Sequence, residues 1–336
     1  MSLSYNTEHP VLVTGATGYV AGWLIQRLLD EGFTVHAAMR NPDDARKRAH
    51  LDEMAEGAKG EIKYFHADLL DDGSFSEAMQ SCEVVFHTAS PFTMKYEDPQ
   101  RDLIDPALNG TQNVLKSVNE IPTVKRVVLT SSIAAVRGGG DDQRNAPDGV
   151  LDESVWNTQS NLDDGPYAYS KTLAEREAWR MADGQDRWRL VVVNPGLVVG
   201  PGKAPTQTSA SFDFLRQIGD GTFKEGTPPV QLPAVDVRDV AEAHFRAGFE
   251  TEAEGRHLTF ERPIWLGEIA DMLEAEFGER FDWPKERPTS SDDPEFKADN
   301  SKLRERLGVE PRDVAPGIKE MFQKMIDVGD VVRQDS

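Results

Sequence analysis

The stretch VLVTGATGYVA, residues 11–21, decides the fold expected of this chain. Its first part, Val11–Thr14, is a short apolar run that predicts a buried β-strand. Gly15 and Gly18 follow with the spacing of a tight turn, and apolar residues then recur with helical periodicity from residue 19 to residue 31. A strand, a glycine turn and a helix in this order leave backbone N–H groups at the start of the helix, where a pyrophosphate can bind.

The same alternation continues along the chain. Further strands are expected at residues 34–39, 61–66, 84–87, 126–130 and 189–194, and helices at 19–31, from Asn41-Pro42-Asp43 onward, and at 166–181. Strands that alternate with helices predict a parallel sheet with right-handed crossovers. The expected fold class is α/β, a Rossmann doubly wound parallel sheet with helices on both faces and a small C-terminal substrate-binding lobe.

The pattern changes after Asn194-Pro195-Gly196. Residues 200–234 are rich in Gly, Pro, Thr and Ser, and residues 260–336 predict helices interrupted by prolines. We expect a dinucleotide-binding domain of residues 1–195 and 235–258, and a substrate-binding lobe of residues 196–234 and 259–336. Residues 137–149, rich in glycine and aspartate, are expected to form a mobile loop.

Composition narrows the functional classes. With 38% hydrophobic and 28% charged residues, the chain of 336 residues has the composition of a soluble globular protein. No apolar run reaches the roughly 20 residues that cross a bilayer, and the N-terminal residues show no signal peptide. Cys82 is the only cysteine, which excludes an intrachain disulfide and favours a cytoplasmic location.

The chain is strongly acidic, because 58 acidic side chains outnumber 37 basic ones and the net charge is -21. Such a charge repels nucleic acid and anionic membranes, so neither is an expected partner. The acidity is either that of an ordinary soluble protein or an adaptation to high salt, where screening removes the self-repulsion. The 7 histidines show no metal-ligand spacing, and no metal is expected.

Several residues at the ends of the expected strands suit a dinucleotide. Arg40 closes the second strand, where a carboxylate would bind the ribose 2′-hydroxyl of NAD and an arginine suits the 2′-phosphate of NADP; the alternative is a solvent-facing arginine. Asp68 follows the third strand and either accepts a hydrogen bond from the adenine amino group or caps a helix. Thr88 and Ala89 follow the fourth strand and are expected to line the cofactor channel.

Tyr167 and Lys171 lie four residues apart in an expected helix, so their side chains share one face, and Tyr169 points elsewhere. An ammonium beside a phenol stabilises the phenolate and lowers the pKa of the phenol, which can then protonate an oxygen as hydride reaches the carbonyl carbon. Ser132, after the fifth strand, can donate a hydrogen bond to the same oxygen, with the adjacent Ser131 as the other candidate.

These segments together resemble the extended short-chain dehydrogenases/reductases of the NAD-dependent epimerase/dehydratase superfamily. The resemblance is to the group of dihydroflavonol 4-reductase, cinnamoyl-CoA reductase and the yeast-type aldehyde and ketone reductases. The matching segments are VTGATGYVA at 13–21, ADL at 67–69, VFHTASP at 85–91, residues 127–132, LDESVW at 151–156, residues 167–175 and NPGLVVGP at 194–201. The resemblance implies a triad of Ser132, Tyr167 and Lys171 and NADPH or NADP as the cofactor.

The resemblance also implies positions around the cofactor. It places Pro195, Gly196 and Val198 beside the nicotinamide, and the 2′-phosphate on Arg40. The complete set of residues expected to contact the cofactor is Thr14, Gly15, Thr17, Gly18, Tyr19, Val20, Arg40, Asp68, Leu69, Thr88, Ala89, Ser90, Thr130, Tyr167, Lys171, Pro195, Gly196 and Val198.

The residues expected to line the substrate pocket are Phe92, Met94, Arg137, Phe212 and Phe214. An apolar, aromatic-lined pocket suits aryl or alkyl aldehydes and ketones, whereas ordinary packing in the lobe would explain the same aromatic residues. Plant flavonoid reductases carry an asparagine five residues after the catalytic serine. Here that position is Arg137, which argues against dihydroflavonol as the substrate. Arg137 either meets a carboxylate or phosphate of the substrate or is a solvated loop residue.

Three functions compete. The leading hypothesis is an NADPH-dependent carbonyl reductase for an aldehyde or ketone, which works in reverse as an alcohol dehydrogenase, has Tyr167 as its proton donor and occurs as a monomer or homodimer. The alternative is an NAD-dependent nucleotide-sugar epimerase/dehydratase, and those enzymes usually carry an acidic residue where Arg40 lies. The third is a non-catalytic cofactor sensor, a class that tends to lose the tyrosine or the lysine that this chain retains.

Overall fold

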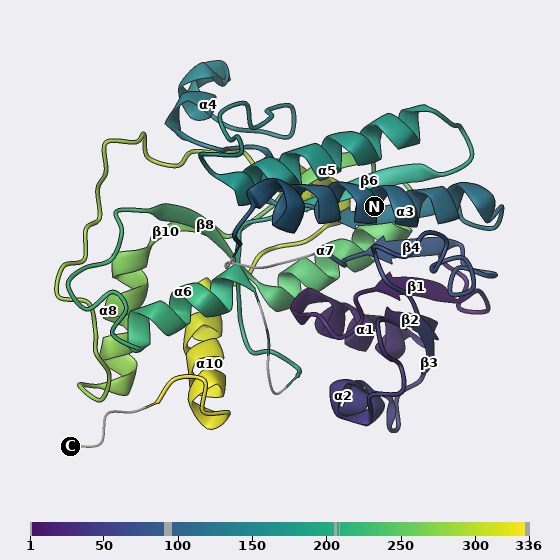
Figure 1. The fold of residues 1–336 in the computed structure, drawn as a ribbon, viewed down its shortest axis with the longest axis horizontal. Helices are drawn as coiled ribbons and strands as arrows, with labels where there is room; N and C mark the ends of the chain where they lie inside the picture. Colours follow the sequence, from purple (N-terminus) through teal and green to yellow (C-terminus); the bar gives the residue numbers. More distant parts are fainter. Residues whose placement is uncertain (1, 91–95, 205–206, 208, 333–336) are drawn as a thin grey trace.

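The computed structural model describes residues 2–90, 96–204, 207 and 209–332 (Figure 1). Its centre is a parallel sheet of seven strands in the order β3-β2-β1-β4-β5-β6-β9. The strands are β1 (Val11–Thr14), β2 (Thr34–Met39), β3 (Glu61–His66), β4 (Val84–His87), β5 (Arg126–Thr130), β6 (Arg189–Pro195) and β9 (Gly255–Thr259). The expected α/β fold with a parallel sheet is confirmed, and β1 to β6 lie at their expected residues.

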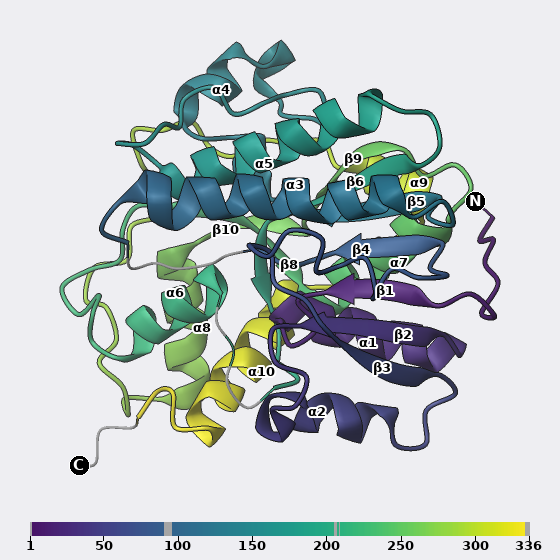
Figure 2. The same ribbon diagram turned by 45° about the vertical axis from the view of Figure 1, so that its right-hand side comes forward.

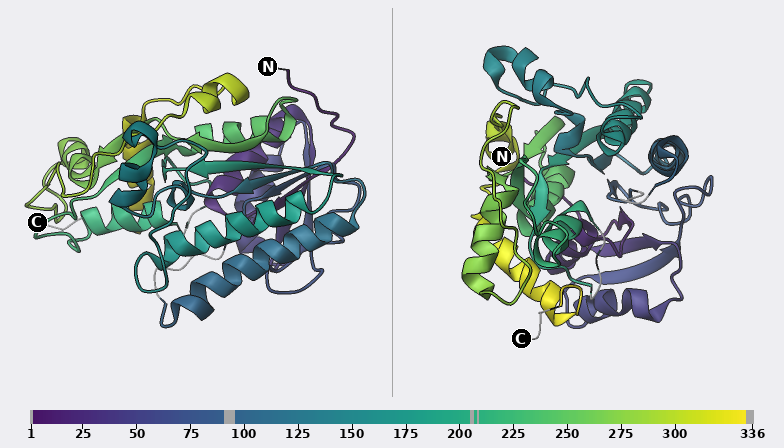
Figure 3. Two further views of the ribbon diagram at one scale, coloured as in Figure 1. Left: turned by 90° about the horizontal axis from the view of Figure 1, so that it is seen from above. Right: turned by 60° about the vertical axis from the view of Figure 1, so that its left-hand side comes forward.

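Helices cover both faces of this sheet. α1 (Tyr19–Glu31) and α7 (Val237–Phe249) pack together on one face, and α3 (Asp105–Glu120) and α5 (Pro166–Asp183) pack together on the other (Figure 3). Successive side chains of a strand point to opposite faces. Val11 and Val13 of β1 therefore join the core under α1 and α7, and Leu12 joins the core under α3 and α5.

A smaller sheet builds the C-terminal lobe (Figure 2). Its strand order is β10-β8-β7, with β7 and β8 parallel and β8 and β10 antiparallel. The lobe consists of β7 (Leu197–Val199), β8 (Gln231–Asp236), β10 (Arg262–Trp265), α6 (Ala210–Gly219), α8 (Leu266–Phe277) and α10 (Val314–Asp327). Apolar side chains from all six elements form one separate core.

Two segments cross the expected division of the chain. The last two residues of β8 were assigned to the dinucleotide-binding domain, but β8 pairs with β7 and β10 in the sheet of the lobe. Helix α9 (Ser301–Leu307) was assigned to the lobe, but Leu303 and Leu307 pack into the core under α1 and α7. The lobe is thus interwoven with the main sheet, and the domain boundaries stay a prediction.

Two local expectations are wrong. The helix expected from Asn41-Pro42-Asp43 begins at Ala45 as α2 (Ala45–Ala55), because the carboxylate of Asp44 caps its N-terminus. Residues 137–149, expected as a mobile loop, contain the short helix α4 (Gly140–Asn145). Gly138 in this stretch packs closely, since a Cβ on it would lie 2.1 Å from the side-chain oxygen of Asn157.

Cys82 is a buried free thiol, and burial raises its pKa to about 12, which leaves the thiol protonated and unreactive at neutral pH.

Across the described part of the chain, no helix combines the length and the apolar character needed to span a membrane.

Gly196, which joins β6 to β7, offers a test of how the lobe meets the main sheet. Its N–H donates to the carbonyl oxygen of Thr259 at 3.0 Å, and a Cβ would lie 2.0 Å from the carbonyl oxygen of Pro233 in β8. We expect Gly196→Ala to lower the free energy of unfolding by about 1–3 kcal/mol, because β8 must shift to relieve the overlap. Thermal and urea unfolding of the cofactor-free protein measure this change.

Gly184→Ala is the matched control, since a Cβ there would lie 3.5 Å from its nearest neighbour, an ordinary contact. Equal stability of the two variants would contradict the close approach of β8 to Gly196.

Candidate active site

The carboxyl ends of β1 and β4 are fastened to each other where the strand order reverses. The hydroxyl of Thr14 accepts a hydrogen bond from the N–H of Ala89 at 3.0 Å, and the hydroxyl of Thr88 donates to the carbonyl oxygen of Thr14 at 2.6 Å. Gly15 has φ +63°, and a Cβ there would lie 3.0 Å from Ala89. Only glycine fits, so the turn after β1 can lie against β4 at the point of an open α/β sheet where ligands bind.

The N-terminus of α1 opens from this turn. Gly18 is its N-cap; within the described residues no side chain caps it, and its first turn contains no acidic residue. The backbone N–H groups and the helix dipole are therefore available to an anion. The side chain of Tyr19 lies away from the turn, because its hydroxyl donates to the carbonyl oxygen of Gly200 at 2.6 Å. This arrangement fits the pyrophosphate of a dinucleotide, with backbone groups as donors.

Arg40 and Asp68 lie at the ends of the next two strands. Arg40 follows β2 directly and is exposed. Asp68 follows β3, and its carboxylate accepts a hydrogen bond from the N–H of Leu70 at 2.9 Å, which closes a turn. Asn113 of α3 supports that turn by donating to the carbonyl oxygens of Asp68 and Leu69 at 3.3 and 3.2 Å. Contacts of Arg40 and Asp68 with a cofactor stay a prediction.

The first turns of α5 carry the tyrosine and lysine. Gly165 lies in the left-handed region and Pro166 begins the helix, so the chain enters α5 in a fixed direction. The ammonium of Lys171 lies 5.9 Å from the centre of the Tyr167 ring and donates to the hydroxyl of Ser90 at 2.8 Å. Ser90 follows β4, so α5 and the β4 end meet across the sheet edge.

The two adjacent serines point in different directions. Ser132 is hydrogen-bonded to Tyr167, and its hydroxyl also accepts the N–H of Ala134 at 3.1 Å. The hydroxyl of Ser131 donates instead to Glu175 at 2.5 Å. Of the two candidates, Ser132 is therefore the one beside the tyrosine.

Burial shifts the pKa values of both Lys171 and Tyr167 on α5. It lowers the pKa of Lys171 to about 8, and the negative charge of Glu175 opposes that shift. Burial raises the pKa of Tyr167, and the hydrogen bond with Ser132 acts in the opposite direction. The lowering of the phenol's pKa that the spacing predicts is thus outweighed here by desolvation, and the ammonium of Lys171 donates its hydrogen bond to Ser90.

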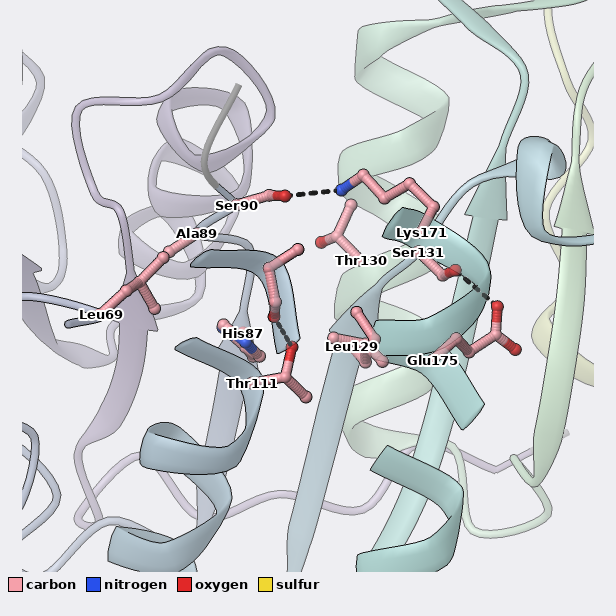
Figure 4. A pocket seen from close by; sticks show the side chains of 12 residues that line it. Leu69, His87, Ala89, Ser90, Thr111, Leu129, Thr130, Ser131, Lys171 and Glu175 are labelled. Atoms are coloured by element: carbon pink, nitrogen blue, oxygen red, sulfur yellow. Dashed lines mark hydrogen bonds between the residues drawn. The ribbon is translucent and has the colours of Figure 1, made fainter. Parts of the chain in front are cut away.

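A small cavity lies between α5 and the ends of β4 and β5 (Figure 4). Its volume is about 20 Å³, which is room for one water molecule. It is lined by Leu69, His87, Ala89, Ser90, Ala107, Thr111, Leu129, Thr130, Ser131, Lys171, Ala174 and Glu175. The cavity thus brings together Lys171 and four other residues expected at the cofactor, Leu69, Ala89, Ser90 and Thr130.

Glu175 and Arg256 belong to this centre, although no role was expected for either. The carboxylate of Glu175 pairs with the guanidinium of Arg256 at 2.6 Å and accepts the amide N–H of Asn194 at 2.8 Å. A signal for Glu175 exists in the sequence, because it lies four residues after Lys171 and so shares its helix face. Nothing local signals Arg256, which lies on β9.

The other expected site residues occupy varied positions. Thr17 and Val20 are half-buried at the start of α1, Pro195 ends β6, and Val198 is half-buried in β7. Phe92 and Met94 lie outside the described residues. Among the described residues, no group of three or more His, Cys, Asp or Glu side chains could hold a metal ion.

The expected substrate-pocket residues that are described lie in or near the lobe. Phe212 is buried in the core of the lobe, where its ring lies 5.0 Å from that of Tyr19, so it has a packing role. Phe214 is half-buried at the edge of the same core. Arg137 donates to the carbonyl oxygen of Pro294 at 3.3 Å and lies 5.7 Å from the Phe296 ring. Arg137 is therefore held against a C-terminal segment, and substrate contacts stay a prediction.

Known proteins share this sequence and this fold. The profile of the NAD dependent epimerase/dehydratase family matches residues 11–258. Cinnamoyl-CoA reductase CAD2 of Medicago truncatula is 43% identical over 277 residues, which are 80% of this chain and 81% of that protein. Tetraketide alpha-pyrone reductase 1 of Arabidopsis thaliana is 38% identical over 80% of this chain and 81% of that protein.

A solved structure extends the likeness to nearly the whole chain. The yeast methylglyoxal/isovaleraldehyde reductase Gre2, complexed with NADPH, superposes with a TM-score of 0.82 and 26% identity over 96% of this chain and 100% of that chain. With the glycine turn and the Ser132, Tyr167 and Lys171 cluster, these likenesses identify the family. The chain belongs to the NAD dependent epimerase/dehydratase family, and within it to the short-chain oxidoreductases of the dihydroflavonol 4-reductase and cinnamoyl-CoA reductase group.

Proposed function

We propose that this protein is an NADPH-dependent reductase that converts the carbonyl group of an aldehyde or ketone to an alcohol, with Tyr167 as the proton donor. One observation carries the proposal: Tyr167, hydrogen-bonded to Ser132, lies on the same helix face as Lys171, at the sheet edge where the glycine turn opens. The uncapped N-terminus of α1 and the exposed Arg40 supply the contacts that a phosphorylated dinucleotide needs.

The residues divide the chemistry as follows. NADPH, when bound, supplies the hydride for the carbonyl carbon. Tyr167 donates its phenolic proton to the carbonyl oxygen, which becomes the hydroxyl of the product, and the resulting phenolate regains a proton from solvent. Ser132 hydrogen-bonds the same oxygen as negative charge develops on it. Lys171 stabilises the phenolate by its positive charge. The reverse reaction, alcohol oxidation with NADP, uses the same groups.

The names of the relatives indicate which carbonyl compounds to examine. They include reductases of a cinnamoyl-CoA, a tetraketide alpha-pyrone and methylglyoxal/isovaleraldehyde. We infer that an aldehyde or ketone is reduced, and that a CoA thioester is a further substrate to test. The panel therefore contains aliphatic and aromatic aldehydes, ketones and cinnamoyl-CoA, each with NADPH and with NADH, followed by absorbance of the reduced cofactor. Turnover of several carbonyl compounds with a clear NADPH preference supports the proposal.

The alternative of a nucleotide-sugar epimerase or dehydratase predicts a different result for the same purified protein. Tightly bound NAD in the purified protein, together with no turnover of any carbonyl compound, would overturn the reductase proposal in favour of an epimerase or dehydratase.

Replacement of the proton donor separates catalysis from cofactor binding. We expect Tyr167→Phe to lower kcat at least about 100-fold, because general acid catalysis contributes about 10²–10⁴-fold, while NADPH binding measured by fluorescence titration stays unchanged. Tyr169→Phe removes the same hydroxyl two residues further along α5 and should keep near-normal activity. Normal turnover by the Tyr167→Phe variant would rule out Tyr167 as the donor.

Replacement of Arg40 tests the choice between the two cofactors. We expect Arg40→Ser to raise KM for NADPH by about 10–100-fold, the loss of a charge-assisted hydrogen bond to phosphate, with little change in KM for NADH. Arg306→Ser, which removes an exposed arginine from α9, controls for the change in net charge. If both cofactors lose affinity equally, Arg40 does not read the 2′-phosphate.

A further inference from the structure

A buried carboxylate lies directly behind the proposed catalytic centre. Glu175 is 1% exposed and extends from α5 one turn after Lys171. Its Oε2 atom accepts hydrogen bonds from the hydroxyl of Ser131 at 2.5 Å and from the amide of Asn194 at 2.8 Å. Its Oε1 atom lies 2.6 Å from Nε of Arg256. Both carboxylate oxygens therefore have fixed partners from three separate strand ends, β5, β6 and β9.

These contacts control the backbone that carries Ser132. The Ser131 hydroxyl is held by Glu175, and the amide of Asn194 donates both to Glu175 and to the carbonyl oxygen of Ser132, the latter at 3.2 Å. The side chain of Ser131 and the carbonyl oxygen of Ser132 are thus both held. A serine held in this way presents its hydroxyl to Tyr167 without a search among rotamers, which is how a supporting layer keeps a catalytic group in place.

The charge of Glu175 also acts on Lys171. Both side chains line the cavity of about 20 Å³, and the close view shows them on the wall formed by α5 (Figure 4). Desolvation lowers the pKa of Lys171 to about 8, and Glu175 is the charge that raises it. The other groups that face the ammonium among the described residues are Ser90, Tyr167 and His87, and burial holds the pKa of His87 at about 3, so His87 is neutral.

We propose that Glu175 is a positioning residue for the active site, which keeps the positive charge on Lys171 and directs the hydroxyl of Ser132 toward Tyr167. The catalytic part of this inference rests on the reductase function proposed above.

Arg256 supplies the opposite charge that a buried carboxylate such as that of Glu175 needs. A buried charge without a partner is strongly destabilising, and Arg256 supplies the opposite charge from β9. The guanidinium is held in turn by the carbonyl oxygen of Val155 at 2.5 Å and by the ring of Trp156, whose centre lies 4.0 Å away. Contacts other than the one with Glu175 therefore also hold the guanidinium in place.

Glu175→Gln tests the inference, because glutamine keeps the size and a carbonyl acceptor but removes the charge. The expected result is a lower apparent pKa of Lys171, since the opposing negative charge is gone. A shift of about one unit reduces the protonated fraction of Lys171 at about pH 8 roughly fivefold. Competitive chemical labelling of Lys171 across pH, read by mass spectrometry, measures this titration without any substrate or turnover.

The pH profile of reduction gives the second readout. Reduction needs Lys171 protonated, so activity is present below the pKa of Lys171 and is lost as pH rises through it. The alkaline limb of kcat/KM should therefore move to lower pH in the Glu175→Gln variant, by the same amount as the labelling curve. A role confined to stability would lower the melting temperature and leave both curves where they are in the unmodified protein.

Two further variants complete the design. Glu177→Gln, on the same helix, removes a carboxylate bound to Gln112 and Arg180 at the surface, and should leave both curves unchanged. The double variant Glu175→Gln with Arg256→Met removes the stranded positive charge as well, so it restores folding where the single variant is unstable.

Lys171 titrating in the folded Glu175→Gln variant as it does in the unmodified protein would overturn the inference; where only the double variant folds, the comparison is with Arg256→Met, which differs from it by the Glu175 charge alone. Absence of carbonyl turnover in the unmodified protein would count against the reductase function alone, because labelling reads Lys171 independently of catalysis.

Discussion

The buried ion pair of Glu175 and Arg256 joins helix α5 to strand β9 across the interior of the molecule. Burying two charges costs several kcal/mol per ion, and their attraction repays this only with good geometry and further hydrogen bonds. The further hydrogen bonds are present, since Ser131 and Asn194 donate to the carboxylate and backbone carbonyl groups accept from the guanidinium. The pair fastens α5 to β9, the last strand of the sheet, so the helix that carries Tyr167 and Lys171 has one position relative to the strand ends.

Strand and helix positions in the main sheet followed from local sequence because their causes are local. Runs such as Val11–Thr14 are buried on both faces of a parallel sheet, so they read as uninterrupted apolar segments. Gly32 ends α1 in the left-handed conformation, which is also a local preference. The prediction of a loop at residues 137–149 missed helix α4 because the causes of the structure there are not local. Gly138, Gly139 and Gly140 lie close to the side chains of Asn157, Gln159 and Asp293, and such distant contacts leave no periodic signal in a short stretch.

The same distinction separates the parts of the site. Tyr167 and Lys171 could be predicted because four residues along a helix bring two side chains to one face. The turn at Gly15 could be predicted from its place between a strand and a helix. Spacing places Glu175 on the helix face of Lys171, but its role could not be assigned, since its partner Arg256 lies 81 residues away on β9 and an acidic residue in a helix is usually solvated. Which of the two serines lies beside Tyr167 also depended on a tertiary contact, the hydrogen bond from Ser131 to Glu175.

The charge distribution bears on how a cofactor with phosphate groups reaches a protein with a net charge of -21. Burial changes this balance little, because the buried acids Asp142, Glu175, Asp236, Asp239 and Glu250 and the buried bases Arg126 and Arg256 are few. The surface is therefore strongly acidic, and repulsion of an anion acts over about 10 Å at 0.1 M salt. In the binding mode proposed above, attraction comes from short-range groups, the N-terminus of α1 and Arg40, which salt screens less than it screens the distant acids. Under the hypothesis of adaptation to high salt, screening would remove the long-range repulsion and leave these contacts, so an acidic surface and an anionic cofactor are compatible.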